Sequence, residues 1–451
     1  MLEGRCVNPE KFARKAAAVL PLGGMMHSSV HATENLLFLT LLQLIVMILA
    51  ARLGNQVSRK LGQPGVIGEI VAGLLLGPSL FGHFFPDASI FLFGAKPSTP
   101  VVIISQIGLV LLMFQIGMDF EFAHLTKPRN RNATVGIAAA SISIPLALGI
   151  IIGQMTAPIL APGMNALTYS LFFGVGLAIT AVPILGRILR EFDLTRTEIG
   201  VVAISAAAVN DVVGWVLLAG ISAYAAAQFS SSAMSFQVGG IVLLLGVAWF
   251  VLRPLIGRML SRFPVHEGEL PPNLMTATIC LIFVMGICTY FLGIFTIFGG
   301  FLCGLLFHHD KIFVDAWRRQ VGRFVLVFFL PVFFTFTGLR TNVLGLSSVS
   351  DWGWLAVVLA AAIGGKIIPV YIASRLSGFN SKEASILGSL MNTRALMELI
   401  VLNIGYDMGF IPQKVFTMLV IMAVVTTVMT GPLLRALLPR AGYVIPAGVE
   451  A

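Results

Sequence analysis

An aspartate stands in the middle of a long apolar stretch of this sequence. Asp211 lies in AISAAAVNDVVGWVLLAG, with about ten apolar or small residues on either side. An ionised carboxylate deep in a membrane is costly, so its presence there requires a function or a partner. Asn210 beside it offers a neutral amide oxygen. Carboxylate, amide, carbonyl and water oxygens together form the ligand set that a hard monovalent cation accepts.

Such a carboxylate can hold either a proton or a metal ion. Burial favours its neutral, protonated form, whereas a bound cation favours the ionised form. A single group that binds the two in turn provides the minimal chemistry for exchanging a cation for a proton. The alternative is a structural carboxylate that is paired permanently with a basic residue.

The apolar stretch before Asp211 contains a proline that interrupts helix geometry. In GLAITAVPILGRILR, Pro183 removes a backbone donor and disfavours helix just before it. A broken helix at membrane depth persists only where it lines a cavity or is buried in protein. Its free carbonyl groups are then predicted to help hold an ion, together with Thr180. A simple proline kink is the other interpretation. The predicted break comprises Thr180, Ala181, Val182 and Pro183.

A second polar interruption occurs in GSLMNTRALMELIVLNIG. Asn392 and Thr393 predict a second break in this otherwise apolar stretch. Arg394 and Glu398 are four residues apart, the spacing of an ion pair on one helix face. Either this pair is structural, or the break brings a fixed positive charge to the point where the two broken helices cross.

Lys366 is also surrounded by apolar residues, in AAIGGKIIPVY. The adjacent Gly364 and Gly365 permit close approach of another helix. Two roles are open for the ammonium group. It neutralises Asp211 when no ion is bound, or it caps the end of a broken helix.

Further polar residues have simpler explanations. Glu69 lies about one turn inside an apolar stretch, as an entrance residue or a helix-end cap. His308, His309 and Asp310 resemble a metal cluster only superficially, because adjacent side chains on a helix diverge. The four cysteines match neither zinc nor redox spacings. We therefore predict no cofactor, and no metal beyond the transported cation at Asp211.

The composition indicates which elements position these residues. Of 451 residues, 57% are hydrophobic and 11% are charged, and the mean hydropathy is +0.94. A soluble protein of this composition would lack the polar residues to cover its surface. We predict an all-α polytopic membrane protein with about 13 spans. They lie near 35–53, 65–82, 101–118, 134–155, 167–189, 199–226, 237–257, 273–291, 293–308, 321–340, 353–374, 382–404 and 414–438.

The distribution of positive charge predicts the orientation. Twenty of the 29 Lys and Arg residues lie in or beside the odd-numbered loops and the C-terminal end. This asymmetry places those regions in the cytoplasm, most simply at the plasma (inner) membrane. It also explains the net charge of +9 without nucleic acid. Cations in the N-terminal extension 1–33 conflict with this orientation, and a start at Met25 or Met26 would remove the conflict.

Two parts of the sequence match each other. IVAGLLLG, 70–77, aligns with IFGGFLCG, 297–304, and the following spans end alike at Gly117 and Gly338. With six spans on each side of a seventh, this predicts two inverted repeats with broken crossing helices. Ordinary helix packing is the alternative explanation for each Gly-x-x-x-Gly. We expect no soluble domain after the last span. The predicted regions are the extension 1–33, first repeat 34–226, linker helix and loop 227–271, second repeat 272–438 and short cytoplasmic tail 439–451.

Seven segments between Gln63 and Gly405 resemble the second monovalent cation:proton antiporter family, in its Kef-like and plant cation/proton-exchanger branch. They are QPGVIGEIVAGLLLGPSLFG, ISQIGLVLLMFQIGMDFE, GLAITAVPILGRIL, AAAVNDVVGW, FGGFLCGLLF, LPVFFTFTGLR and NTRALMELIVLNIG. The resemblance implies thirteen helices, a homodimer, and a mobile core of spans 4–6 and 11–13. This core would carry the ion by an elevator motion along a scaffold of spans 1–3 and 8–10.

The resemblance also implies roles for individual residues. Asp211 matches the essential carboxylate of the family, Thr180 and Pro183 its first broken helix, and Lys366 its core-helix lysine. Electrogenic members carry two adjacent acids, whereas this chain has Asn210 before Asp211. Asparagine there is typical of electroneutral exchange, but a lysine at position 366 is more typical of electrogenic exchange.

We therefore predict a secondary active antiporter, not an enzyme, that exchanges Na⁺ or K⁺ for H⁺ by alternating access. A cation-coupled symporter of an organic solute on the same fold is the alternative. It would require a larger midplane pocket with more polar groups. A channel would require a carbonyl-lined filter, and an intramembrane enzyme a nucleophile–base pair or a metal triad, and we find none of these in the sequence.

Overall fold

The computed structural model describes residues 29–94, 98–118, 128–226, 231–266, 268–293, 295–394 and 396–444. The predicted extension 1–33 and tail 439–451 therefore fall largely outside the described residues. The chain divides into two compact units, 1–42 and 43–451. The described part of the first unit is the beginning of one helix, α2. The second unit contains the other helices and all predicted site residues.

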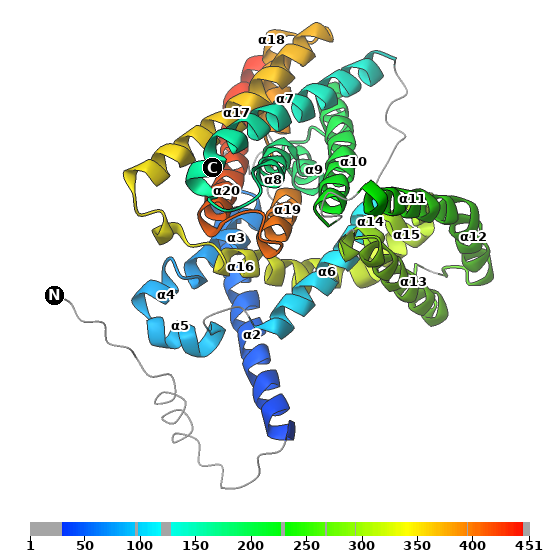
Figure 1. The fold of residues 1–451 in the computed structure, drawn as a ribbon. Coiled ribbons are helices and arrows are strands. Elements are labelled where there is room, and N and C mark those ends of the chain that lie inside the picture. Colours follow the sequence, from blue (N-terminus) through cyan, green and yellow to red (C-terminus); the bar gives the residue numbers. More distant parts are fainter. Residues whose placement is uncertain are drawn as a thin grey trace, which may run out of the picture. The chain divides into compact units, whose positions relative to one another are not determined.

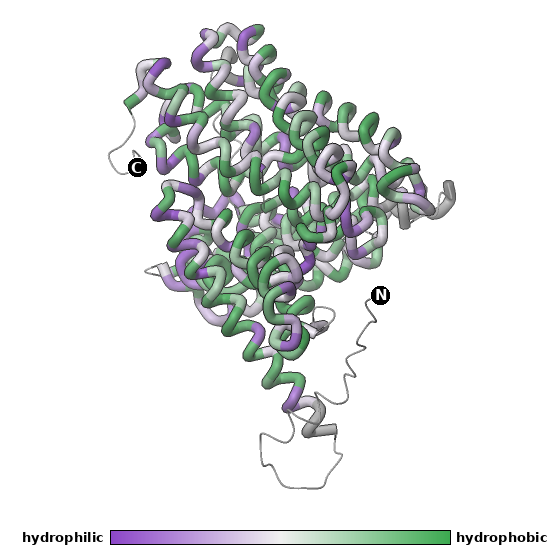
Figure 2. The backbone as a smooth tube through the Cα atoms, turned by 90° about the vertical axis from the view of Figure 1, so that its left-hand side faces the viewer, coloured by the Kyte–Doolittle hydropathy of each residue, from purple (hydrophilic) through white to green (hydrophobic). Residues whose placement is uncertain are grey.

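The described residues form helices and no strand, apart from one isolated bridge. In the described part of the chain, eleven helical segments are long and apolar enough to cross a membrane, and α8 and α14 are shorter apolar helices. Figure 2 shows that apolar residues dominate along most helices. The prediction of an all-α polytopic protein is confirmed, while the count of 13 spans stays a prediction.

Figure 1 shows the helices coloured in chain order, from blue at the N-terminus to red at the C-terminus. Three short π-helical segments, η2, η3 and η4, continue or precede α-helices. The helix bounds are α2 Ser29–Lys60, α3 Gly65–Leu76, α4 Phe81–Phe84, α5 Pro86–Phe93, α6 Thr99–Met118, α7 Pro128–Leu160, α8 Ala166–Ala178, α9 Val182–Glu191, α10 Glu198–Ala226, α11 Ser231–Val247, η2 Ala248–Leu252, α12 Arg253–Arg262, α13 Pro272–Phe291, α14 Thr296–Phe307, α15 Lys311–Trp317, η3 Arg318–Gly322, η4 Val325–Phe329, α16 Leu330–Leu339, η5 Val343–Gly345, α17 Val349–Leu376, α18 Ser381–Met391, α19 Leu396–Asp407, α20 Gln413–Leu437 and η6 Pro439–Ala441.

Most of these helices sort into two groups by their contacts. The core group comprises α7, α8, α9, α10, α17, α18, α19 and α20, which pack on one another. The scaffold group comprises α3, α6, α13, α14 and α16. Among the described residues, extensive contacts lie within each group, and the α3–α20 contact joins them more sparsely. This division supports the expected mobile core and scaffold.

Two close helix crossings hold the scaffold group together. A Cβ at Gly73 of α3 would lie 2.7 Å from the Thr335 Cα of α16. A Cβ at Gly304 of α14 would lie 2.9 Å from the Gly117 Cα of α6. In the alignment of the repeats, α3 corresponds to α14 and α6 to α16. The crossing of α3 with α16 therefore corresponds to the crossing of α14 with α6, and this correspondence supports the predicted repeats.

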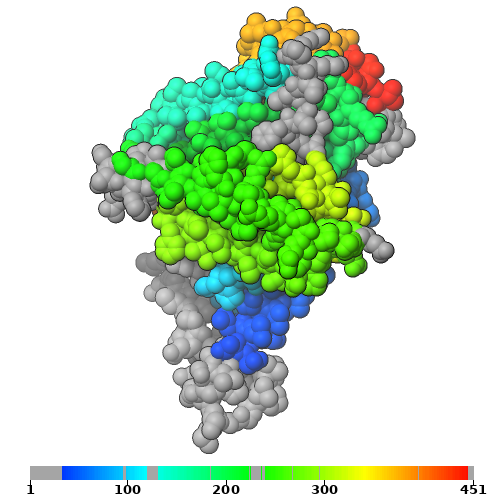
Figure 3. All heavy atoms as spheres, turned by 90° about the vertical axis from the view of Figure 1, so that its right-hand side faces the viewer, coloured from blue at the N-terminus to red at the C-terminus, as the bar shows by residue number. Residues whose placement is uncertain are grey.

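The helices of the predicted linker, and α13 at the start of the second predicted repeat, expose apolar side chains. Leu243 of α11, Phe250 of η2 and Phe291 of α13 are each at least two-thirds exposed. In Figure 3 the green part of the chain, which includes α11, α12 and α13, forms a continuous face. A face of this composition is suited to contact with lipid chains.

The glycine crossings predict a specific cost of adding one methyl group. Gly304→Ala should lower the free energy of unfolding by about 1–3 kcal/mol, because the new Cβ overlaps the α6 backbone. Thermal unfolding of the purified protein in detergent measures the effect. Gly246→Ala in α11 is the control, since a Cβ there meets no atom within 4 Å. Equal melting temperatures for the two variants would contradict this packing.

Candidate functional site

The first broken helix lies between α8 and α9. α8 ends at Ala178 and α9 begins at Val182, with extended backbone at Ala181 (φ −90°, ψ 103°). Thr180 and Ala181 therefore lie in the break. Val182 and Pro183 were predicted within it but open α9 instead. Proline is tolerated in the first turn of a helix because its missing N–H would have no intrahelical partner there.

The second broken helix lies between α18 and α19 (Figure 1). α18 ends at Met391 and α19 begins at Leu396. Asn392 and Thr393 lie in this interruption, as the polar residues in the sequence predict. Arg394 lies there too, so it precedes α19.

The two breaks contact each other directly. The backbone N–H of Ala181 donates to the Thr393 carbonyl at 3.2 Å. The Thr180 hydroxyl donates to the Met391 carbonyl at 3.2 Å. Residues more than 200 positions apart thus satisfy backbone groups that the breaks leave free, as buried polar groups require.

Asp211 lies in α10 and is 1% exposed. Neither oxygen of its carboxylate has a hydrogen-bond partner among the described residues. Two groups nevertheless interact with its charge, the backbone N–H of Val182 at the start of α9 and the ammonium of Lys366. The start of a helix carries partial positive charge and stabilises an anion. The carboxylate is therefore buried with both oxygens available to a cation or a proton.

Asn210 fastens α10 to the first break. Its amide oxygen accepts the Thr180 N–H at 3.2 Å. Its amide nitrogen donates to the Ser141 hydroxyl at 2.8 Å and to the Ala178 carbonyl at 3.3 Å. The observed contacts give Asn210 a positioning role. Its role as a neutral ligand for the ion stays a prediction. In that role, the ion would be bound by the lone pair of the amide oxygen that the Thr180 N–H leaves free.

Lys366 is completely buried in α17. Its ammonium donates to the Ser141 carbonyl at 2.8 Å and also to the Ala178 carbonyl. Ala178 is the last residue of α8, so Lys366 caps the end of a broken helix. Its charge also acts on Asp211. The two roles that the sequence leaves open are therefore compatible in one geometry.

Arg394 brings a positive charge to the crossing of the breaks. Its guanidinium donates to the Gly176 carbonyl at 2.9 Å and to the Ala362 carbonyl at 3.2 Å. The distance from Arg394 to the Glu398 carboxylate is longer, 4.0 Å. The structural pair that the sequence leaves open is therefore present, although Arg394 precedes α19 and the two residues do not lie on one continuous helix. The other interpretation, a fixed charge at the crossing, agrees with these contacts.

Several site residues were missed in the sequence. Ser141 of α7 contacts both Asn210 and Lys366, but a lone serine in an apolar stretch gives no signal of this. Thr427 of α20 accepts the Arg394 backbone N–H at 3.3 Å. The cluster of threonines in VVTTVMT was the one sequence feature that indicated a polar face on α20.

Glu69 does not have the helix-capping role predicted for it, and its role as an entrance residue stays a prediction. One carboxylate oxygen accepts a hydrogen bond from the Asn55 amide at 2.5 Å, and the residue is 5% exposed. This contact ties α3 to α2. α3 has no side-chain cap at its start, so Glu69 does not act as one.

The histidine pair lies at the end of α14 and holds no metal cluster. No group of three or more His, Cys, Asp or Glu in the described part of the chain is arranged to hold a metal ion. His309 accepts a hydrogen bond from Arg253 at 2.9 Å. Partial burial, together with the nearby His308, Arg253 and Lys311, holds the pKa of His309 below its usual value. Its neutral form is the one that can accept from Arg253.

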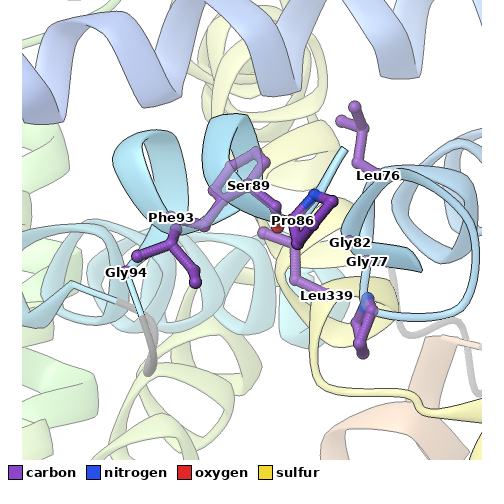
Figure 4. Close-up of a pocket in the computed structure, with 10 residues that line it drawn as sticks. Leu76, Gly77, Gly82, Pro86, Ser89, Phe93, Gly94 and Leu339 are labelled. Carbon is purple, nitrogen blue, oxygen red and sulfur yellow. The ribbon is translucent and has the colours of Figure 1, made fainter. Parts of the chain in front are cut away.

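A cavity of about 240 Å³ lies away from Asp211, between α3, α4, α5 and the end of α16. Figure 4 shows its lining, which contains no ionisable side chain. It therefore has no group that could exchange a proton. The lining residues are Leu76, Gly77, Pro78, Gly82, Pro86, Ser89, Ile90, Phe93, Gly94 and Leu339.

Comparison with known proteins identifies the family. The model of the sodium/hydrogen exchanger transmembrane family matches residues 44–440. The chain belongs to this family. Its members are transporters and not enzymes, in agreement with the prediction from the sequence.

Similar proteins are named as cation/proton antiporters. The chain is 38% identical to Cation/H(+) antiporter 18 of Arabidopsis thaliana, over 88% of this chain and 49% of that protein. It is 34% identical to Na(+)/H(+) antiporter NhaS4 of Synechocystis, over 91% of this chain and 99% of that protein. It is 30% identical to K(+)/H(+) antiporter 1 of Saccharomyces cerevisiae, over 89% of this chain and 47% of that protein. The chain spans about half the length of the plant and yeast relatives.

A solved structure has the same fold. The sodium proton antiporter MjNhaP1 of Methanocaldococcus jannaschii, at pH 8, matches with a TM-score of 0.59 and 18% identity. The match covers 89% of this chain and 97% of that chain. It supports the fold assignment, while the roles of individual residues depend on the geometry described above.

The capping role of Lys366 predicts a stability effect. Lys366→Met should lower the melting temperature clearly, because the buried Ser141 carbonyl loses its hydrogen bond from Lys366, at about 1–3 kcal/mol, and the Ala178 carbonyl keeps only the one from Asn210. Lys414→Met is the control, since the Lys414 side chain is 49% exposed and pairs with Asp351 near the start of α17. Equally small decreases in melting temperature for the two variants would contradict a capping role for Lys366.

Proposed function

We propose that this protein exchanges a monovalent cation, Na⁺ or K⁺, for H⁺, one for one. Asp211 binds the cation and the proton in turn. The observation that carries this proposal is the buried Asp211 carboxylate, whose two oxygens lack hydrogen-bond partners among the described residues. A permanently paired structural carboxylate would have its oxygens occupied.

The charges around Asp211 explain why binding is exclusive. Lys366 and Arg394 are held in place by backbone carbonyls and remain near the crossing whether or not an ion is bound. A carboxylate in this environment is neutralised either by a proton or by a cation. Simultaneous binding of both would add an uncompensated positive charge in a region without water, which is costly. Displacement of one by the other couples the two fluxes.

The groups flanking the carboxylate support cation binding. We propose that Thr180 and Asn210 contribute oxygens to the bound ion, while the break residues Ala181 and Val182 supply backbone groups. Asn392 supports a contribution from the second break, because its amide oxygen is buried without a hydrogen-bond partner in the described structure. A set of neutral oxygens around one carboxylate suits Na⁺ and K⁺ alike.

Alternating access follows from the two groups of helices. We propose that the core group carries Asp211 past the scaffold group, so that the ion is exposed first on one side of the membrane and then on the other. The sparse contacts between the groups support such a motion. Both broken helices lie in the core group and would travel with the ion.

We propose that the protein lies in the plasma membrane with its C-terminal end in the cytoplasm and acts as a homodimer. The charge asymmetry supports this orientation. The same asymmetry and the matched glycine crossings support the repeats 34–226 and 272–438, with 227–271 as the linker. The symporter alternative has no support, because the similar proteins described above are named as cation/proton antiporters.

Transport in proteoliposomes tests the central role of Asp211. Asp211→Asn keeps the size of the side chain but can neither ionise nor carry a proton, so cation-driven proton movement should fall to the level of empty liposomes. A trapped pH-sensitive dye reports the rate for Na⁺, K⁺ and Li⁺. Asp315→Asn is the control, because Asp315 is an exposed partner of Arg318 on α15. Normal exchange by the Asp211→Asn variant would refute the assignment.

One-for-one exchange also predicts independence of the membrane potential. If one cation replaces one proton, no net charge crosses the membrane in a cycle. The initial rate should then be equal with and without a potential imposed across the liposome membrane. A rate that changes severalfold with the sign of the potential would indicate that more than one proton moves per cation.

A further inference from the structure

A cluster of polar contacts joins the two helix groups at the end of α16. Arg340 Nη1 lies 2.6 Å from the Asp407 carboxylate at the end of α19. The same nitrogen donates to the Asn403 amide oxygen at 3.3 Å. The guanidinium also lies over the Phe336 ring, 4.2 Å from its centre. One scaffold arginine thus holds two residues of a core helix.

Three more hydrogen bonds connect the same two groups nearby. Asn403 donates to the Thr337 hydroxyl at 2.9 Å. The backbone N–H of Asn342, just after α16, donates to the Thr417 hydroxyl at 3.3 Å. Gln413, at the start of α20, donates to the Arg340 carbonyl. All of these contacts join the end of α16 or the residues after it to α19 and α20.

The Arg340–Asp407 pair is partly shielded from water. The Arg340 side chain is 13% exposed and that of Asp407 is 37% exposed. An ion pair at a fully exposed position contributes little because water screens it. Partial burial and the additional hydrogen bonds to Asn403 make this pair stronger than an exposed one.

The opposite end of α20 is joined to α3 and its neighbours more weakly. There Arg435 donates to the Gly62 carbonyl, in the turn between α2 and α3, at 3.1 Å. It is a single hydrogen bond to a neutral acceptor. In the proposed orientation, this end faces the cytoplasm and the Arg340 cluster faces outside. Among the described residues, the two groups are thus joined by more contacts on the outer side than on the inner side.

We propose that Arg340, Asp407, Asn403, Thr337 and Gln413 form the outer gate of the transporter. The gate must open each time that the ion site reaches the outer side, because the core group cannot move past α16 while these contacts remain. This inference rests on the proposed orientation and alternating access. It assigns a function to charged residues that play no part in binding the ion.

Thiol labelling in intact cells tests the gate without relying on transport. Thr341→Cys is the reporter, in a chain whose four native cysteines are replaced by serine. Thr341 is completely buried and directly follows Arg340. A membrane-impermeant maleimide should label it slowly in the otherwise unchanged chain. Adding Arg340→Gln or Asp407→Asn should speed labelling about tenfold, the equivalent of one lost charge-assisted hydrogen bond.

A matched control separates the gate from general loosening. Lys414 and Asp351 form another ion pair, at 3.0 Å, between α20 and α17, so both residues belong to the core group. Lys414→Gln should leave the labelling rate unchanged. The charge-swapped double variant Arg340→Glu with Asp407→Arg should return labelling towards the slow rate. This recovery would show that fast labelling in the single variants results from loss of the ion pair and not from misfolding.

The possible results are distinct. Unchanged labelling in both single variants would overturn the gate, and so would equally fast labelling in the Lys414→Gln control. Fast labelling of the gate variants in a protein that exchanges no cation for protons would refute the proposed function and leave the gate standing.

Discussion

A helix that is interrupted inside a membrane must find partners for its free backbone groups, and most of this site follows from that requirement. The Ala178 carbonyl at the end of α8 receives Lys366 and Asn210. The break at Ala181 finds its partner in the second break, at Thr393. Because the backbone groups are satisfied by each other and by fixed cations, neither oxygen of the buried Asp211 carboxylate in α10 has a hydrogen-bond partner among the described residues, and this makes Asp211 available for an ion.

The same requirement explains why the cations are buried. Lys366 and Arg394 do not form close ion pairs with the buried acids. They donate to carbonyls of α7, α8 and α17, which can satisfy them without neutralising their charge. The crossing therefore keeps its positive charge, and a bound proton or cation at Asp211 changes the charge of the site by about one unit. In the proposed mechanism, motion of the core group then depends on the contacts that hold it to the scaffold.

Much of the fold was predictable because bilayer thickness and helix periodicity leave few alternatives. An apolar run with Asp211 at its centre, and prolines or asparagines in two others, was enough to predict the breaks. The partners of these residues were not predictable. Ser141 and Ala178 bind Lys366 through backbone carbonyls, which every residue has, so no residue type marks them. The pairing of Arg394 with Glu398 was predictable from their spacing, but the position of Arg394 before α19, which begins only at Leu396, was not.

The central claim is that one carboxylate holds a cation or a proton, never both. Calorimetry of the purified protein tests it directly, with Na⁺ or K⁺ titrated at one pH in two buffers of different ionisation enthalpy. If Asp211 is the shared site, cation binding releases up to about one proton per ion as the pH is lowered. The apparent heat then differs between buffers, and the Asp211→Asn variant shows no such difference. Cation binding with the same heat in both buffers, across the pH range in which transport occurs, would contradict the account.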